Sequence, residues 1–194
     1  MAYKQHFIEW FSGKQLPSYW TGAQVAGSGG SASMADAIDG GINVNSGSGS
    51  NNSYAIYFNN KRQYSATGSV MINVSKINVS TNYRGGGVGM SNVHATNGNN
   101  YIYFQNTASN TYIKAVSRST SGLFSDTSVT QDANYHSFKG ECKSSSAEFT
   151  IDGGLQVTHT TNLPTLALQP FIYADDSSSV SADMRCIYCE AYNT

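Results

Sequence analysis

Hydrophobic and polar residues alternate along most of the chain, which is the period-two pattern of half-buried β-strands. The pattern is clearest between residues 135 and 160. It predicts one strand around Phe138, a second around Phe149 and a third in which Leu155 and Val157 share a face. Asp152-Gly153-Gly154 separates the second strand from the third, and its glycines accept the positive φ of a tight turn. These residues predict an antiparallel hairpin beside a further strand.

The same alternation recurs from the N-terminal third to the C-terminus, and no helical period of useful length interrupts it. In residues 69–79 the parity slips after Val74, which predicts a β-bulge near Ser75. The glycines of residues 83–90 predict that a loop or a ligand packs closely over that strand. Short strands between regular turn signals are typical of an all-β protein, so we expect a two-sheet antiparallel sandwich. The strand-like segments are residues 7–11, 54–60, 69–79, 83–90, 101–105, 111–118, 166–173 and 180–192.

Size and charge narrow the class of protein further. A chain of 194 residues is expected to form one domain, residues 1–194. Only 12% of the residues are charged and the net charge is -1, a balance that argues against a nucleic-acid partner. No apolar run approaches the roughly 18 residues of a membrane-spanning helix, so no membrane insertion is expected. The N-terminus does not resemble a secretory signal, which predicts either synthesis in a cytoplasm or a signal that has already been cut away.

The three cysteines, Cys142, Cys186 and Cys189, are an odd number, which predicts buried free thiols rather than a disulfide framework. Residues i and i+3 of a strand point to opposite faces, so Cys186 and Cys189 are not expected to bind zinc. The four histidines are predicted to lie on the surface. No cofactor is expected, although loop aspartates offer oxygen ligands for a structural calcium ion. These are Asp36, Asp39, Asp175, Asp176 and Asp183, and capping of turns is the explanation that we favour.

The order of features resembles the concanavalin A-like lectin/glucanase jelly roll, in the LamG-like variety found in phage and other virion proteins. The resemblance spans nearly the whole chain through short motifs. They are Phe11, Gly13 and Trp20; Gly40-Gly41-Ile42; Tyr135-His136 with Phe138; Phe149 with Ile151 to Gly154; Asn162 to Pro164; Leu168 to Tyr173; and residues 182–192. The resemblance implies a jelly-roll sandwich, a fold that carries many functions.

Glycoside hydrolases of this family carry an E-x-D-x-x-E strand, because two carboxylates must act as nucleophile and general acid. The chain has no such strand. Its only glutamates are Glu9, Glu141, Glu148 and Glu190, and Glu141 and Glu148 flank a serine-rich turn. The absence of the motif predicts that the protein is not an enzyme.

One face of the predicted sheet is rich in tyrosine. Aromatic rings stack on the apolar faces of sugars while amides and guanidinium groups bind hydroxyls, so this face is a candidate glycan site. The alternative is that the tyrosines, which are good strand formers, simply cover an exposed sheet or pack against neighbouring subunits. The candidate glycan-binding residues are Tyr57, Arg84, Tyr101, Tyr103, Gln105 and Tyr112, with Asn59 as a possible neighbour.

Together these observations predict a non-catalytic structural protein of a virion surface, a capsid decoration, cement or fibre module. Its partners would be other virion or assembly subunits and cell-surface glycans, and we expect it to be oligomeric or bound to an assembly. The predicted location is the virion surface, with an extracellular location as the alternative. Two other functions stay open: a free lectin-like carbohydrate-binding module, and a glycoside hydrolase or polysaccharide lyase with non-standard catalytic residues.

Overall fold

The computed structural model describes residues 5–34, 40–49, 51–58, 63–77, 85–93, 100–107, 110–175 and 182–194. This part of the chain contains fifteen β-strands and no helix. The strands are β1 (His6–Trp10), β2 (Thr21–Ala26), β3 (Ser31–Met34), β4 (Ile42–Asn45), β5 (Ser53–Tyr57), β6 (Ser69–Ile77), β7 (Gly86–Ser91), β8 (Tyr101–Asn106), β9 (Tyr112–Arg118), β10 (Gly122–Thr130), β11 (Tyr135–Cys142), β12 (Ala147–Ile151), β13 (Gly154–His159), β14 (Gln169–Asp175) and β15 (Asp183–Asn193).

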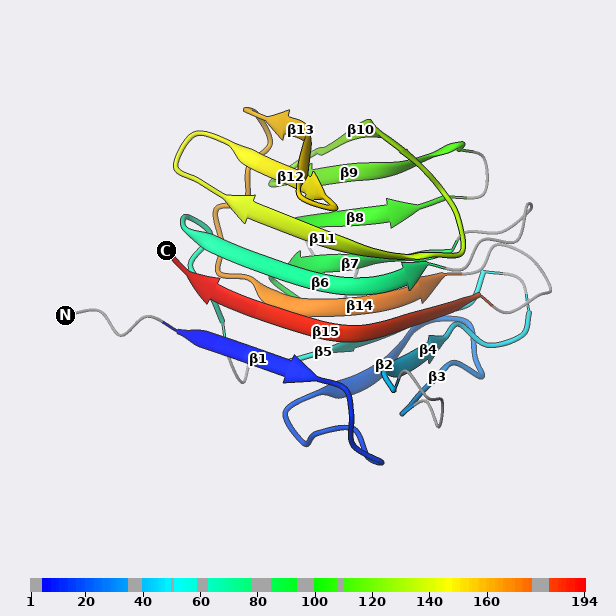
Figure 1. Ribbon diagram of the computed structural model, residues 1–194. Coiled ribbons are helices and arrows are strands. Elements are labelled where there is room, and N and C mark those ends of the chain that lie inside the picture. The colour runs from blue at the N-terminus through cyan, green and yellow to red at the C-terminus, as the bar shows by residue number, and fades with distance from the viewer. Residues whose placement is uncertain are drawn as a thin grey trace.

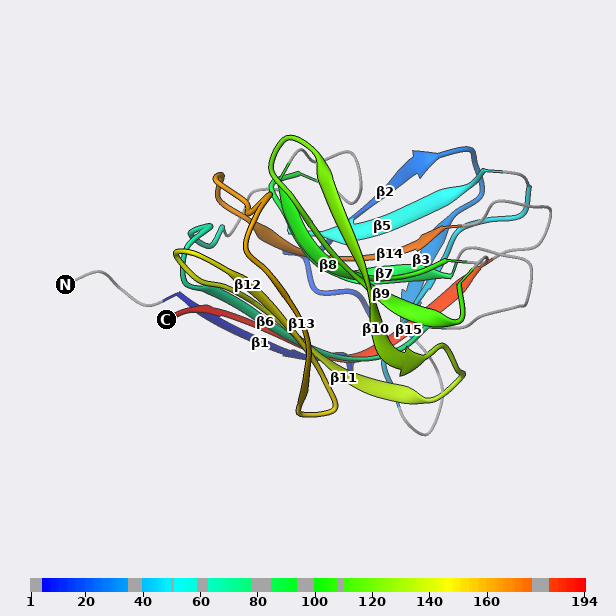
Figure 2. The same ribbon diagram turned by 90° about the horizontal axis from the view of Figure 1, so that it is seen from above.

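The strands form two antiparallel sheets that lie face to face (Figure 1, Figure 2). The eight-stranded sheet has the order β13-β12-β11-β6-β15-β4-β3, and β1 also pairs with β15. The seven-stranded sheet has the order β10-β9-β8-β7-β14-β5-β2. The predicted all-β antiparallel sandwich is therefore confirmed. The single-domain boundary of residues 1–194 stays a prediction.

The main hydrophobic core lies between the two sheets. Phe104 of the seven-stranded sheet packs its ring 5.0 Å from that of Phe138 and 5.4 Å from that of Phe149, both in the eight-stranded sheet. A second aromatic group, in which Trp20 and Phe7 each lie 4.6 Å from Phe58, belongs to the same buried cluster. The sheets adhere because these rings are removed from water, a transfer worth several kcal/mol for each fully buried aromatic side chain, about 3–5 kcal/mol by truncation to alanine.

The predicted hairpin forms as β12 and β13, with the turn residues Asp152 and Gly153 at φ values of 50° and 80°. The prediction that Leu155 and Val157 share a face is wrong. Val157 opposes Phe149 and packs on the core, whereas Leu155 opposes Thr150 and is 60% exposed. A register shift between Phe149 and Thr150 is the reason, since an extra residue in one strand turns the following side chains to the other face.

The bulge predicted near Ser75 lies in the strand that pairs with it. Ser75 opposes Cys186 and Val74 opposes Tyr188, so Ile187 is the extra residue, in β15. The bulge turns Cys186 and Cys189 to the same face, and both are fully buried. The expectation that they point to opposite faces is therefore wrong, because it assumed an unbroken strand.

All three cysteines are buried free thiols. Burial raises the pKa of the Cys142 and Cys186 thiols to about 12, because the thiolate loses the water that would solvate it. Within the described ranges, no three His, Cys, Asp or Glu side chains are grouped so that they could hold a metal ion. Of the proposed calcium ligands, Asp36, Asp39 and Asp176 lie outside the described residues, while Asp183 accepts a hydrogen bond from the Asn45 amide at 2.5 Å.

His159 is buried, although the histidines were predicted to lie on the surface. It lies in β13 at the edge of the eight-stranded sheet, and its Nδ1 is 2.8 Å from the Ser117 hydroxyl of the seven-stranded sheet. Its Nε2 is 3.0 Å from the Ser125 hydroxyl of β10. Burial lowers the pKa of His159, which favours the neutral ring, and the serine hydroxyls can donate or accept as that ring requires. His159 therefore joins the two sheets at this edge.

Among the described residues there is no helix of the length and hydropathy needed to cross a bilayer.

Candidate functional site

The face of the seven-stranded sheet that points away from the core, here the seven-stranded face, is built from two adjacent rows of side chains. Strand register defines the rows, because directly opposed residues of antiparallel strands point to the same side. The first row runs across six strands through Asp126, Lys114, Gln105, Gly87, Tyr173 and Ala55. The second runs beside it through Phe124, Val116, Tyr103, Gly89, Phe171 and Tyr57.

The middle of this face is a compact aromatic cluster, distinct from the main core. The Tyr103 ring lies 5.0 Å from that of Tyr101, 5.7 Å from that of Phe171 and 5.9 Å from that of Tyr173. All four side chains are at most 3% exposed. Burial raises the pKa of the Tyr103 phenol well above its ordinary value, so it stays protonated and donates a hydrogen bond to Gln105 at 3.2 Å.

The glycines of β7 make room for these rings. A Cβ atom on Gly89 would lie 2.2 Å from the Tyr103 Cβ and 2.2 Å from the Ile102 carbonyl oxygen. A Cβ atom on Gly87 would lie 2.7 Å from the Tyr173 ring. Something does pack over this strand, as its glycine pattern predicts, and the rings of Tyr103 and Tyr173 are part of it.

The accessible part of the face lies over β8, β9 and β10, and we call it the β8–β10 strip. Phe124 is 51% exposed and Tyr112 is 42% exposed. Between them lie Gln105, which is half-buried, and an ion pair in which the Lys114 ammonium is 3.3 Å from the Asp126 carboxylate. The strip therefore combines exposed rings with an amide, a cation and a carboxylate.

The structure brings most of the predicted glycan-binding residues to one sheet face, but the exposed fractions of their side chains differ. Gln105 and Tyr112 belong to the accessible strip, and Tyr57 is half-buried in β5. Tyr101 and Tyr103 are both only 3% exposed, so in this structure they support the face rather than present their rings. Arg84 and Asn59 lie outside the described residues. Binding of a glycan by these side chains stays a prediction.

Sequence reasoning missed four side chains of this face. Phe124 and Asp126 lie in β10, which the analysis of alternation passed over because Leu123 to Asp126 places two apolar residues before two polar ones and does not alternate. Lys114 lies in the strand-like segment of residues 111–118 but was not among the candidate site residues. Arg118 holds its guanidinium 5.8 Å from the Tyr101 ring centre, a cation–π contact between β9 and β8 that only register reveals.

The carboxylates of this face are far apart. Besides Asp126, the described residues place one other acid on the seven-stranded sheet, Asp175 at the end of β14. Four strand spacings separate β10 from β14, a distance of about 19 Å. Paired glycosidase carboxylates lie about 5–5.5 Å apart in retaining enzymes and about 6.5–9.5 Å apart in inverting ones. Asp126 and Asp175 therefore cannot form such a pair.

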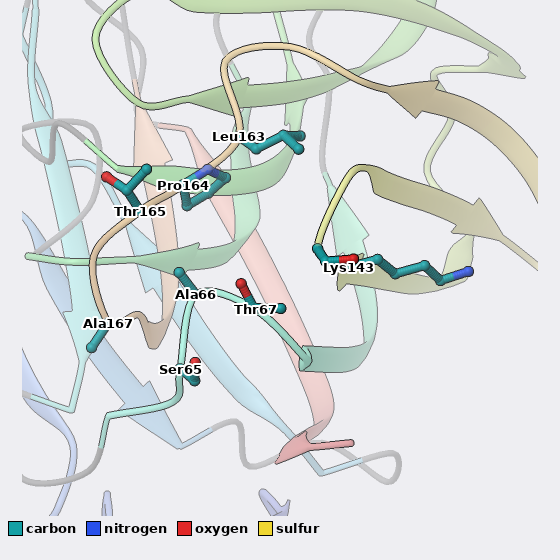
Figure 3. Close-up of a pocket in the computed structure, with 9 residues that line it drawn as sticks. Ser65, Ala66, Thr67, Lys143, Leu163, Pro164, Thr165 and Ala167 are labelled. Atoms are coloured by element: carbon teal, nitrogen blue, oxygen red, sulfur yellow. The ribbon is translucent and has the colours of Figure 1, made fainter.

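A separate pocket of about 460 Å³ opens between the segment before β6, the turn after β11 and the segment before β14. Figure 3 shows Leu163, Pro164 and Thr165 on one side of it and Ala66 and Thr67 on another. No residue that lines the pocket is Asp, Glu or His, and the ionisable group of the lining is Lys143, which is paired with Glu148 at 2.6 Å. Its lining is Ser65, Ala66, Thr67, Lys143, Ser144, Leu163, Pro164, Thr165 and Ala167.

No family profile matches the sequence, and no curated protein matches it either. Solved structures do match. A β-glucanase of Bacillus licheniformis is similar with a TM-score of 0.66 and 14% identity, over 97% of this chain and 98% of that one. The catalytic domain of an endo-1,3-β-glucanase (laminarinase) from Thermotoga petrophila gives 0.70 and 10%, over 96% of both chains. The Crh5 transglycosylase gives 0.68 and 11%, over 97% of this chain and 84% of that one.

These comparisons correct the functional prediction. The similar structures are enzymes that act on glycans, which contradicts the prediction of a non-catalytic virion-surface protein and the prediction that the chain is not an enzyme. The missing E-x-D-x-x-E strand could not decide the question, because it tests one catalytic arrangement and not glycan chemistry as a whole. Nothing in the comparisons supports a phage or virion setting. At this level of identity they show the fold: the chain is a concanavalin A-like jelly roll.

Proposed function

We propose that this protein is a glycan-active enzyme, a hydrolase, transglycosylase or lyase, that holds its substrate on the seven-stranded face. The observation that carries the proposal is the match of nearly the whole chain to glucanases and a transglycosylase. A glycan substrate is compatible with an extracellular location, which stays a prediction.

The β8–β10 strip has the chemistry that binding of a sugar needs. Phe124 and Tyr112 expose rings that can stack on the apolar face of a pyranose. Gln105 and Lys114 lie between them and offer donors to hydroxyl groups, and the Asp126 carboxylate offers acceptors. The buried cluster around Tyr103 fixes the backbone beneath the strip, so the binding groups are held on rigid strands.

Proton transfer is assigned to Asp126. Within the described residues it is the accessible carboxylate of the strip, with a side chain that is 54% exposed. Cleavage or transfer of a glycosidic bond requires protonation of the leaving oxygen, and elimination requires removal of a carbon-bound proton. Asp126 and the Lys114 ammonium beside it, 3.3 Å away, are the ionisable pair that can take part in either step.

The test is a panel of β-glucans, other neutral polysaccharides and uronate polysaccharides. New reducing ends would identify a hydrolase, chain-length redistribution a transglycosylase, and an unsaturated ultraviolet-absorbing product a lyase. Asp126→Asn should lower turnover by about 100-fold or more, the usual contribution of a general acid or base. Phe124→Ala should weaken substrate binding.

The matched control is Glu148→Gln, because Glu148 is also an ion-paired surface carboxylate but lies on the other sheet. Its turnover should equal that of the parent protein. Retention of glycans without any product from the whole panel would refute the enzymatic proposal. Full activity of Asp126→Asn would refute the role of Asp126 and leave the substrate class in place.

A further inference from the structure

Arg118 of β9 is a half-buried cation on the seven-stranded face whose charge no acid of the described chain neutralises. Strand register places it in a third row of side chains, beside the two rows already described. Lys114, the cation of the β8–β10 strip, is 3.3 Å from the Asp126 carboxylate, whereas within the described ranges no carboxylate forms an ion pair with Arg118. One positive charge of this face is therefore left uncompensated. The third row runs through Gly122, Arg118, Tyr101, Ser91 and Gln169.

The contacts of Arg118 hold its guanidinium in place without cancelling its charge. The group lies 5.8 Å from the centre of the Tyr101 ring, and its Nη1 donates to the Tyr101 hydroxyl at 3.4 Å. Its Nε is buried and has no hydrogen-bond partner among the described residues. Because Nε is covered, a ligand can reach the guanidinium only through its terminal nitrogens, Nη1 and Nη2. A planar cation that is fixed against a ring and has donors to spare suits a carboxylate or a similar oxyanion.

An exposed aromatic ring lies beside this guanidinium. Phe124 is 51% exposed, and a Cβ atom on Gly122 would lie 2.6 Å from Cε2 of its ring. The Phe124 ring therefore leans over Gly122, which is the residue directly opposite Arg118 in the β9–β10 register. Aromatic rings stack on the apolar faces of sugars. A sugar that stacks on Phe124 would thus carry its substituents next to the Arg118 guanidinium.

We infer that the substrate of this face is an acidic glycan, and that Arg118 binds the carboxylate or sulfate group of the sugar that stacks on Phe124. The inference rests on the proposed function, which places the glycan on this face. Stacking by itself accepts neutral and acidic sugars alike, whereas an uncompensated guanidinium favours an anionic one.

The position of Arg118 makes it a specificity-determining residue and not a catalytic one. Lys114 and Arg118 are four residues apart in β9, about 13 Å along the strand, and Asp126 lies opposite Lys114. That distance is longer than one sugar ring. The sugar that Arg118 holds is therefore a neighbour of the sugar that Asp126 contacts, in the same glycan chain.

Matched pairs of oligosaccharides test the role of the charge. Oligomers of polygalacturonate and of polymannuronate are compared with their carboxyl-reduced forms, and oligomers of a sulfated galactan with their desulfated form, by isothermal titration calorimetry. The two members of a pair differ only in the anionic group. In at least one pair the parent protein should bind the anionic member about tenfold or more tightly, as expected for hydrogen bonds to a charged group. The pair that shows the difference identifies the anion.

Substitutions of Arg118 assign this preference to one side chain. Arg118→Gln keeps hydrogen-bond donors but removes the charge, so the ratio of the two dissociation constants should fall to about one. Arg118→Lys keeps the charge without the two-pronged geometry and should keep part of the ratio. Both ligands of a pair are measured on the same protein, so a change in the stability of a variant does not move the ratio. Arg185→Gln is the matched control, because Arg185 lies in β15 of the other sheet, and it should keep the ratio of the parent protein.

Equal affinity of the parent protein for both members of every pair, or binding of neither member, would overturn the inference. A preference that survives in Arg118→Gln would overturn it as well. Turnover of neutral β-glucans without any preference for an anionic oligomer would keep the proposed enzyme and remove its acidic substrate. Binding of an anionic oligomer that depends on Arg118, with no product from any polysaccharide, would support the inference and refute the enzymatic proposal.

Discussion

Replacing Gly89 by alanine tests whether the aromatic cluster of the seven-stranded face sits directly on the backbone of β7. The added Cβ would meet the Ile102 carbonyl oxygen and the Tyr103 Cβ, each at 2.2 Å, and neither atom can turn aside. β7 and β8 must then separate, an overpacking that costs up to about 3 kcal/mol. Loss of unfolded-state entropy returns about 0.4–1 kcal/mol. The expected net destabilisation is about 2 kcal/mol.

The matched control is Gly140→Ala, also in a buried strand position. There the nearest atom is the Cδ1 of Ile102 at 3.2 Å, the far end of a flexible side chain, so the variant should stay within about 1 kcal/mol of the parent protein. Urea unfolding measures both. For a chain of this length, the melting temperature of Gly89→Ala should fall by roughly 4–8 °C. Equal stability of the two variants would refute the close approach of Tyr103 to β7.

The remaining predictions concern ionisable groups. The His136 ring is 2.6 Å from Asp152 and 3.1 Å from Asp132. Burial alone would lower the pKa of His136, but the two carboxylates outweigh burial and raise it above 6.5. For Asp132 and Asp152, desolvation would raise the pKa of each carboxyl group, but hydrogen bonds outweigh it and lower both pKa values. The contribution of His136 to the free energy of unfolding is therefore complete below about pH 6.5 and is lost as the pH rises through the raised pKa of its ring. The contribution of the two aspartates is lost as the pH falls below about 3.9. Because the carboxylates are largely exposed, the loss of unfolding free energy should be no more than about 1 kcal/mol. Chemical denaturation between pH 6 and pH 9 should show this loss in the parent protein but not in His136→Gln. Iodoacetamide should leave the Cys142 and Cys186 thiols unmodified at neutral pH until the protein unfolds, and rapid labelling of the native protein would contradict their burial.

The sheet architecture could be predicted from the sequence because alternation is a local signal. Ile102 and Phe104 do face the main core while Tyr101 and Tyr103 face the opposite way, as the alternation of β8 predicts. Single-residue irregularities could not be predicted in the same way. The extra residue Ile187 lies in β15, whereas the only visible trace of it was the broken parity near Ser75 in its partner strand.

The candidate site depends on non-local pairing, and that is why its accessible half was missed. Lys114 and Asp126 are twelve residues apart and become neighbours only through the β9–β10 register. The tyrosines were recognised because they are conspicuous in composition, yet Tyr101 and Tyr103 turned out to be buried. Alternation shows which face a residue joins, but exposure within that face is decided by what packs over it.

The two outer faces of the sandwich differ in a way that bears on the proposed function. On the seven-stranded face, the central rings of Tyr103 and Tyr173 are already buried within the chain, so the accessible groups lie toward one edge, on β9 and β10. On the outer face of the eight-stranded sheet, Ile72 and Val74 are half-buried at the centre and Trp10 is 64% exposed. A polar strip over a rigid aromatic cluster suits a hydroxyl-rich ligand. The outer face of the eight-stranded sheet is aliphatic at its centre and, among the described residues, lacks such a strip. The outer faces of the two sheets differ because the central strands of each sheet turn different side chains outward.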